Sequence, residues 1–104
     1  MPRHTVCRVT DVFDGEMKAF EVGKRRVLVA RIGENWYAVN DTCSHAEASL
    51  AMGELDAEEC TVSCPLHSGV FELETGEGVE YPATDPIDVF PVAIEDGEVV
   101  VDIG

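Results

Sequence analysis

Two short segments of the sequence each contain one cysteine and one histidine. The first is Cys43-Ser44-His45 and the second is Cys64-Pro65-Leu66-His67, with eighteen residues between them. Two thiolates and two imidazoles are the ligand set of either a tetrahedral zinc site or a [2Fe–2S] cluster in which two histidines replace two cysteines. The candidate metal ligands are therefore Cys43, His45, Cys64 and His67.

The spacing of these ligands favours the cluster over zinc. Zinc modules usually carry a pair of like ligands on each arm, two to four residues apart. Here each segment is mixed, and Ser44 alone separates the two ligands of the first. A binuclear cluster suits this arrangement, because each segment can give its cysteine to one iron and its histidine to the other. A structural zinc module that acts as a binding domain remains an alternative.

The ligand segments, extended to Cys64-Pro65-Leu66-His67-Ser68-Gly69, resemble the cluster-binding signature of Rieske-type proteins. The resemblance continues outside the ligands, covers nearly the whole chain and is closest to the small ferredoxins of that family. The further matching stretches are 48–50, 53–55, 62–63, 70–73, 75–76, 82–86 and 89–103.

This resemblance implies one Rieske-type [2Fe–2S] cluster. It places Cys43 and Cys64 on a more deeply buried iron, and His45 and His67 on an outer iron with their far ring nitrogens turned towards solvent or a partner. The stretch 82–86 resembles the proline loop that covers the cluster in the family.

The resemblance also implies a function. The family's small ferredoxins carry single electrons from a flavin-containing ferredoxin reductase to the terminal oxygenase of an aromatic-ring dioxygenase, such as the biphenyl, naphthalene or carbazole systems. We expect an electron-transfer component that is not itself an enzyme. Only His4 remains besides the two cluster histidines, too few for an oxygenase's mononuclear iron site. A Rieske carrier for a monooxygenase, an assimilatory reductase or a redox-sensing role remain alternatives.

The chain carries a net charge of −14 at pH 7, unevenly distributed. All seven lysines and arginines lie in the first 31 residues, whereas residues 32–104 hold seventeen carboxylates. Such a surface repels phosphate backbones and anionic membranes, so we expect neither nucleic acid nor membrane as a partner. We expect a monomer whose partners are basic where they meet it. The expected docking residues beside the ligand segments are Glu47, Glu54, Glu72 and Asp85.

The elements that must position the ligands have the pattern of short β-strands. Apolar alternation followed by turn residues marks the ranges 5–13, 17–22, 26–32 and 36–40, which we expect to form an antiparallel meander. Short strands are expected at 60–64 and 70–73, and 89–94 should pair with 99–103 across Asp96-Gly97. The pattern contains no convincing helix longer than the fragment 45–52.

These patterns predict an all-β protein, a small antiparallel sandwich or barrel. The resemblance adds a Rieske-type fold in which a cluster-binding subdomain made of two loops, approximately residues 41–80, is inserted into a single domain of residues 1–104. Cys60 shares strand parity with Val62 and is expected to face the interior, while His4 is expected in a mobile terminus. Without an export signal or a long apolar run, we expect a cytoplasmic location.

Overall fold

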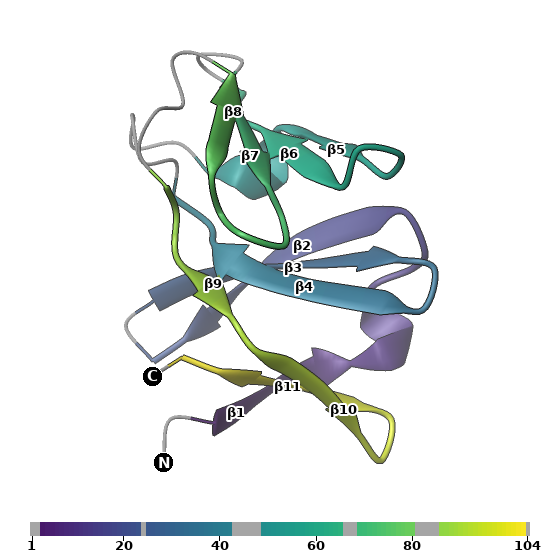
Figure 1. The fold of residues 1–104 in the computed structure, drawn as a ribbon. Helices are drawn as coiled ribbons and strands as arrows, with labels where there is room; N and C mark the ends of the chain where they lie inside the picture. Colours follow the sequence, from purple (N-terminus) through teal and green to yellow (C-terminus); the bar gives the residue numbers. More distant parts are fainter. Residues whose placement is uncertain (1–2, 24, 43–48, 66–68, 81–85, 104) are drawn as a thin grey trace.

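The computed structural model describes residues 3–23, 25–42, 49–65, 69–80 and 86–103. In this part of the chain the strands form three antiparallel sheets, arranged as layers (Figure 1). Two short 3₁₀ helices accompany them, η1 (Val9–Asp11) and η2 (Leu50–Met52). None of the described helices is long and apolar enough to cross a membrane. The expected all-β class is confirmed.

The middle layer is a four-stranded sheet in the order β2-β3-β4-β9. Its strands are β2 (Glu16–Val22), β3 (Arg25–Ile32), β4 (Asn35–Asn40) and β9 (Val89–Phe90). Four consecutive residues of β3, Val27 to Ala30, are fully buried. Because successive side chains of a strand point to opposite faces, this run supplies Val27 and Val29 to one core and Leu28 and Ala30 to another. The middle sheet therefore separates two hydrophobic cores.

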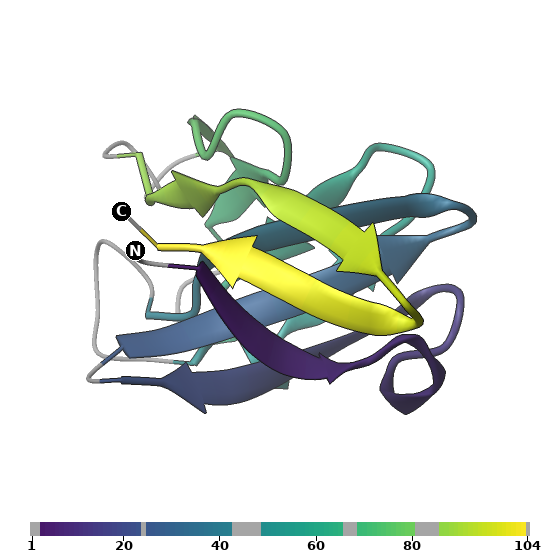
Figure 2. The same cartoon turned by 90° about the horizontal axis from the view of Figure 1, so that it is seen from below.

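The lower sheet has the order β1-β11-β10. Its strands are β1 (Arg3–Arg8), β11 (Glu98–Asp102) and β10 (Val92–Glu95). Seen from below, β1 lies beside β11, with Arg3 opposite Asp102, so the two ends of the described chain are neighbours (Figure 2). The expectation that the first strand joins a meander with the next three was wrong.

His4 lies in β1 opposite Val101, which corrects its placement in a mobile terminus.

Two expected strands end earlier than their apolar pattern. The run 5–13 stops at Arg8, where the chain turns into η1 and the Arg8 amide donates to the Asp11 carboxylate at 2.8 Å. The run 89–94 divides at Pro91, which cannot donate to a strand ladder. Phe90 pairs with Ala38 in the middle sheet, while Val92 pairs with Val101 in the lower one. The expected hairpin with β11 is therefore confirmed only for β10.

The turn of that hairpin matches its sequence. Asp96 and Gly97 link Glu95 to Glu98, and both have positive φ, 53° and 77°. This is the pattern of a two-residue type I′ turn, which suits the twist of the flanking strands.

The upper sheet has the order β5-β6-β7-β8. Its strands are β5 (Glu54–Asp56), β6 (Thr61–Ser63), β7 (Val70–Glu72) and β8 (Gly78–Glu80). Val62 and Phe71 point from this sheet towards Leu28 and Val39 of the middle sheet, and all four are fully buried. Strands β5 and β8 were not predicted, because each has a single apolar residue, flanked by Asp, Glu or Gly residues that are uncommon in strands.

Candidate metal centre

The second ligand segment is the connection between β6 and β7. Cys64 follows β6 directly and is 2% exposed, and its amide donates to the Gly69 carbonyl at 2.7 Å. Ser63 and Val70, the residues that flank this segment, are paired in the sheet. The two ends of the segment are thus held together by the hydrogen bond between Cys64 and Gly69 and by the pairing of β6 with β7. Its histidine, His67, lies outside the described residues.

The first ligand segment connects β4 to η2. Its ligands, Cys43 and His45, lie outside the described residues, but both of its ends are described. Thr42 and Ser49 form an isolated antiparallel bridge, and the Leu50 amide donates to the Asp41 carbonyl at 2.7 Å. The chain therefore leaves and re-enters the described fold at neighbouring points.

Asp41 closes this base with its side chain as well. It is a fully buried charged residue, and its carboxylate accepts hydrogen bonds from the Ser49 hydroxyl at 2.6 Å and the Ala51 amide at 3.0 Å. The Arg26 Nε donates to the same carboxylate at 3.3 Å. The sequence interpretation did not single out Asp41. A signal was available, because Asp41 continues the parity of Tyr37 and Val39, and an acidic residue at a core-facing position needs partners.

The bases of both segments abut one core. Leu50, which follows the first segment, and Cys64, which begins the second, belong to the hydrophobic cluster between the upper and middle sheets. Ile87 joins the same cluster just after the stretch 82–86, and its amide donates to Gly76 at 2.8 Å. The described ends of the ligand segments and of the expected proline loop therefore pack against the same hydrophobic core. Residues 82–85 themselves lie outside the described part.

Cys60 and Tyr37 form a small polar contact within this core. Cys60 has φ 58° and stands in the turn before β6. The expectation that Cys60 is part of this strand was therefore wrong. It nevertheless packs half-buried against the same core as Val62. A hydrogen bond to the Cys60 side chain, followed by burial and the nearby Glu74 carboxylate, raises the pKa of Tyr37 to about 12. The Tyr37 hydroxyl therefore stays protonated at neutral pH.

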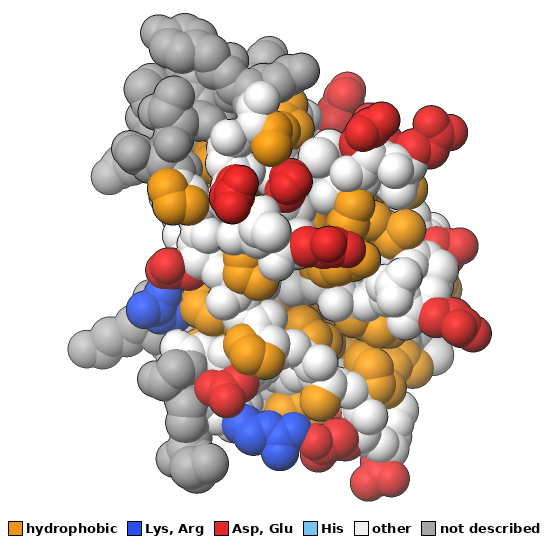
Figure 3. Space-filling model, in the orientation of Figure 1, with side chains coloured by type: hydrophobic (Ala, Val, Ile, Leu, Met, Phe, Trp, Pro, Cys, Tyr) orange, Lys and Arg blue, Asp and Glu red, His pale blue; other side chains and the backbone are white. Residues whose placement is uncertain are grey.

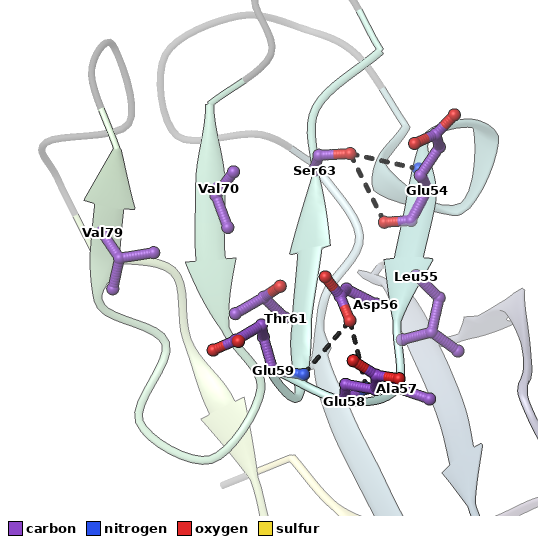
Figure 4. Close-up of a pocket in the computed structure, with 10 residues that line it drawn as sticks. All are labelled: Glu54, Leu55, Asp56, Ala57, Glu58, Glu59, Thr61, Ser63, Val70 and Val79. Carbon is purple, nitrogen blue, oxygen red and sulfur yellow. Dashed lines mark hydrogen bonds between the residues drawn. The ribbon is translucent and has the colours of Figure 1, made fainter.

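The flank of the upper sheet carries an acidic hollow of about 880 Å³ (Figure 4). Glu54 stands at one end of β5, while Asp56, Glu58 and Glu59 surround the turn at the other end. Asp56 accepts hydrogen bonds from the amides of Glu58 and Glu59 at 3.0 and 3.1 Å. On the face in Figure 3, carboxylates lie over the upper sheet, and the basic side chains lie lower. Of the expected docking residues, Glu54 is exposed and Glu72 half-buried, whereas Glu47 and Asp85 lie outside the described residues.

Three comparisons place this chain among known proteins. A family model for the Rieske [2Fe–2S] domain matches residues 3–91. The 3-phenylpropionate/cinnamic acid dioxygenase ferredoxin subunit of Escherichia coli K12 is 39% identical over 99% of this chain and 95% of its own length.

Two solved structures are also similar over nearly the full chain. The ferredoxin of carbazole 1,9a-dioxygenase from Nocardioides aromaticivorans has a TM-score of 0.93 and 35% identity, with 97% of each chain covered. A chain from a complex of reduced oxygenase and oxidised ferredoxin of carbazole 1,9a-dioxygenase has a TM-score of 0.88 and 37% identity. That match covers 97% of this chain and 93% of the other.

Proposed function

Because the chain belongs to the Rieske [2Fe–2S] domain family, we propose that it carries single electrons to the terminal oxygenase of a multicomponent aromatic-ring dioxygenase. The observation that carries this proposal is the similarity over nearly the whole chain to the ferredoxin subunits of such dioxygenases. In this role the protein is an electron-transfer component and not the catalyst. The oxygenase partner is supported by the likeness to a chain from an oxygenase–ferredoxin complex.

We propose that Cys43, His45, Cys64 and His67 hold the cluster. Two thiolates and two neutral imidazoles are the donor set that a Rieske centre requires. The environment of Cys64 fits this role, because its side chain is buried and its segment is closed by the bond to Gly69. The cluster, when bound, supplies a site that accepts and releases one electron. The chain supplies a support in which Cys64 is buried.

We propose residues 41–80 as the cluster-binding subdomain of a single domain spanning residues 1–104. The sheet β5-β6-β7-β8 supports this assignment. Its four strands lie in the sequence between β4 and β9, which are neighbours in the middle sheet, and the second ligand segment connects β6 to β7. We further propose a flavin-containing ferredoxin reductase as electron donor, because the implied chemistry needs a one-electron source. No disulfide joins Cys7, Cys60 and Cys64 in the described part of the chain, which favours a reducing, cytoplasmic setting.

The test begins with the purified protein. We expect red-brown protein with two irons and two sulfides per chain, no zinc, and an EPR signal after dithionite reduction with the low average g of a histidine-ligated cluster. A colourless protein with one zinc and no sulfide would contradict the electron-carrier proposal and favour a zinc module.

The client is tested separately by coupling the protein to a reductase and to candidate oxygenases. We expect turnover of an aromatic substrate to depend on the protein, with saturation as its concentration rises. Turnover by a monooxygenase or an assimilatory reductase alone would keep the carrier role and replace the client.

A further inference from the structure

Asp41 is fully buried, yet five hydrogen bonds connect it to its surroundings. Its carboxylate accepts from Ser49, Ala51 and Arg26, at 2.6, 3.0 and 3.3 Å. Its backbone amide donates to the Arg26 carbonyl at 3.0 Å, and its carbonyl accepts from Leu50 at 2.7 Å. The buried charge is therefore fully engaged, as a buried carboxylate must be to persist in the folded state.

The partners of Asp41 lie on both sides of the first ligand segment. Arg26 belongs to β3, which pairs with β4 immediately before that segment. Ser49 and Ala51 follow the segment and enter η2. The carboxylate thus ties the point where the chain leaves β4 to the point where it returns. The bonds to Ser49 and Ala51 fix the separation of the two ends of the segment.

An apolar side chain at position 41 could fill the same space but could not make these ties. Tyr37 and Val39 share the parity of Asp41 on β4, and both pack in the upper core. A carboxylate in such a position costs free energy of desolvation, which the hydrogen bonds must offset. Filling the core does not require this residue type, whereas the bonds from the Ser49 hydroxyl and the Ala51 amide need a side-chain acceptor at this position.

We infer that Asp41 is a positioning residue that ties together the two described ends of the first ligand segment and thereby slows loss of the [2Fe–2S] cluster. This inference rests on the proposed assignment of Cys43 and His45 as ligands. Groups that orient metal ligands without touching the metal commonly change metal affinity by about 10- to 100-fold when they are replaced. Asp41 acts on the ligands through the ends of their segment.

The test uses the cluster-loaded protein and the variant Asp41→Asn, which keeps the shape of the side chain but removes its charge. Loss of visible absorbance is followed during incubation with an iron chelator, and the EPR spectrum of the reduced protein is recorded. We expect Asp41→Asn to lose iron about tenfold faster than the wild type and to show broadened EPR lines. Ser49→Ala removes the 2.6 Å bond alone and should give a smaller acceleration, which keeps the test usable if Asp41→Asn does not fold.

Two controls separate positioning from general stability. Asp56→Asn alters a carboxylate that also accepts two amide hydrogen bonds but closes a turn without ligands, so it should lose iron at the wild-type rate. Val101→Ala makes a cavity in the lower core, away from the upper-core support of both segments, and lowers global stability. It should leave the EPR line shape unchanged.

Three outcomes are distinguishable. Faster loss in Asp41→Asn or Ser49→Ala than in Val101→Ala, with altered EPR lines, supports the inference. Equal loss rates and identical spectra in all variants, with iron and sulfide present in the wild type, overturn it and leave the carrier proposal intact. A wild-type protein without iron and sulfide overturns both.

Discussion

Glycines at two turns have the same backbone angle but different surroundings. Gly76 and Gly97 both have φ 77°, a conformation that is strained for other residues. A Cβ added at Gly76 would overlap the carbonyl oxygen of Ile87 and lie 2.8 Å from a methyl carbon of Val89, whereas at Gly97 it would meet nothing within 4 Å. We expect Gly97→Ala to lower the free energy of unfolding by about 1 kcal/mol. Gly76→Ala should lower it by about 2 kcal/mol more, because overlap adds to strain.

Urea unfolding followed by far-UV circular dichroism measures this difference. Because the two positions share φ, the difference between the variants reports the overlap alone. Equal losses in both variants would show that the chain after Gly76 moves aside freely. That result would weaken the case that Ile87 anchors the end of the expected proline loop.

Cys7 makes stability depend on pH. Burial, followed by the nearby Asp11 carboxylate, raises the pKa of the Cys7 thiol from its usual 9.0 to about 11, while Lys18 partly opposes the shift. Between pH 9 and 11 the unfolded chain releases this proton and the folded chain keeps it. The free energy of unfolding should therefore fall as pH rises through this window.

We expect Cys7→Ala to make that decline shallower. The measurement is urea unfolding of both proteins at pH 8 and pH 10.5. The comparison is between slopes, so the small cavity left by the substitution cancels. Parallel slopes would show that the thiol is not protected in the folded state.

At the scale of elements, Arg31 links η1 to the middle sheet. Its Nη1 donates to the carbonyls of Val9 and Val12 at 3.4 and 3.3 Å, and its Nε donates to Gly33 at 3.2 Å. The guanidinium carbon lies 5.1 Å from the centre of the Trp36 ring. Lysine cannot reproduce a planar donor set that also stacks, so Arg31→Lys should lower the free energy of unfolding by about 1–2 kcal/mol.

Arg25→Lys is the matched control for this prediction. Arg25 also lies over an aromatic ring, at 5.6 Å from the centre of Phe90, and it pairs with Asp88 at 3.6 Å. Both members of that ion pair are substantially exposed, so the change should be about 0.5 kcal/mol or less. Similar losses in the two variants would mean that the carbonyl contacts of Arg31 contribute nothing beyond stacking.

The sequence predicted where strands begin better than it predicted which strands pair with one another. Strands β2, β3 and β4 begin within one residue of their predicted starts, because alternation and turn residues are local signals. Alternation carries no information on distant pairing, so the union of β1 with β11 was missed. Strands β5 and β8 were missed because each has only one apolar residue, next to charged residues or glycine. The assignment of the cluster ligands remains a prediction from their spacing, because Cys43, His45 and His67 lie outside the described residues. The role that we infer for Asp41 depends on contacts between separate segments, which no local pattern shows.

At the scale of the whole molecule, the middle sheet separates two hydrophobic cores that support different parts of the chain. Its lower face packs on the sheet formed by both ends of the described chain, and its upper face packs on the sheet that bears the second ligand segment. The upper sheet is formed by residues after position 31, where the sequence has no lysine or arginine. Its own residues therefore supply no positive charge to balance its carboxylates. The electrostatic field of the protein is therefore most negative on the side that also carries the second ligand segment.

This charge separation predicts how the protein meets its oxygenase. We expect the oxygenase to be basic where it meets this protein, and attraction between opposite charges speeds the encounter of two proteins. Salt screens this attraction over about 10 Å at 0.1 M ionic strength. Electron transfer from the reduced protein to its oxygenase, measured by stopped flow, should therefore slow as salt is added. At low salt Glu54→Lys should slow it roughly threefold to tenfold, because Glu54 is exposed at the start of β5, soon after the first ligand segment.

Glu34→Lys provides the control, since it changes the net charge by the same amount at a remote site. Glu34 precedes β4, whereas the first ligand segment follows it, so the six residues of β4 separate them by roughly 20 Å. We expect this variant to retain most of the wild-type rate. If the two variants slowed transfer equally, net charge would control encounter and the location of Glu54 would not matter. If the wild-type rate were independent of salt, docking would not be steered by the acidic surface at all.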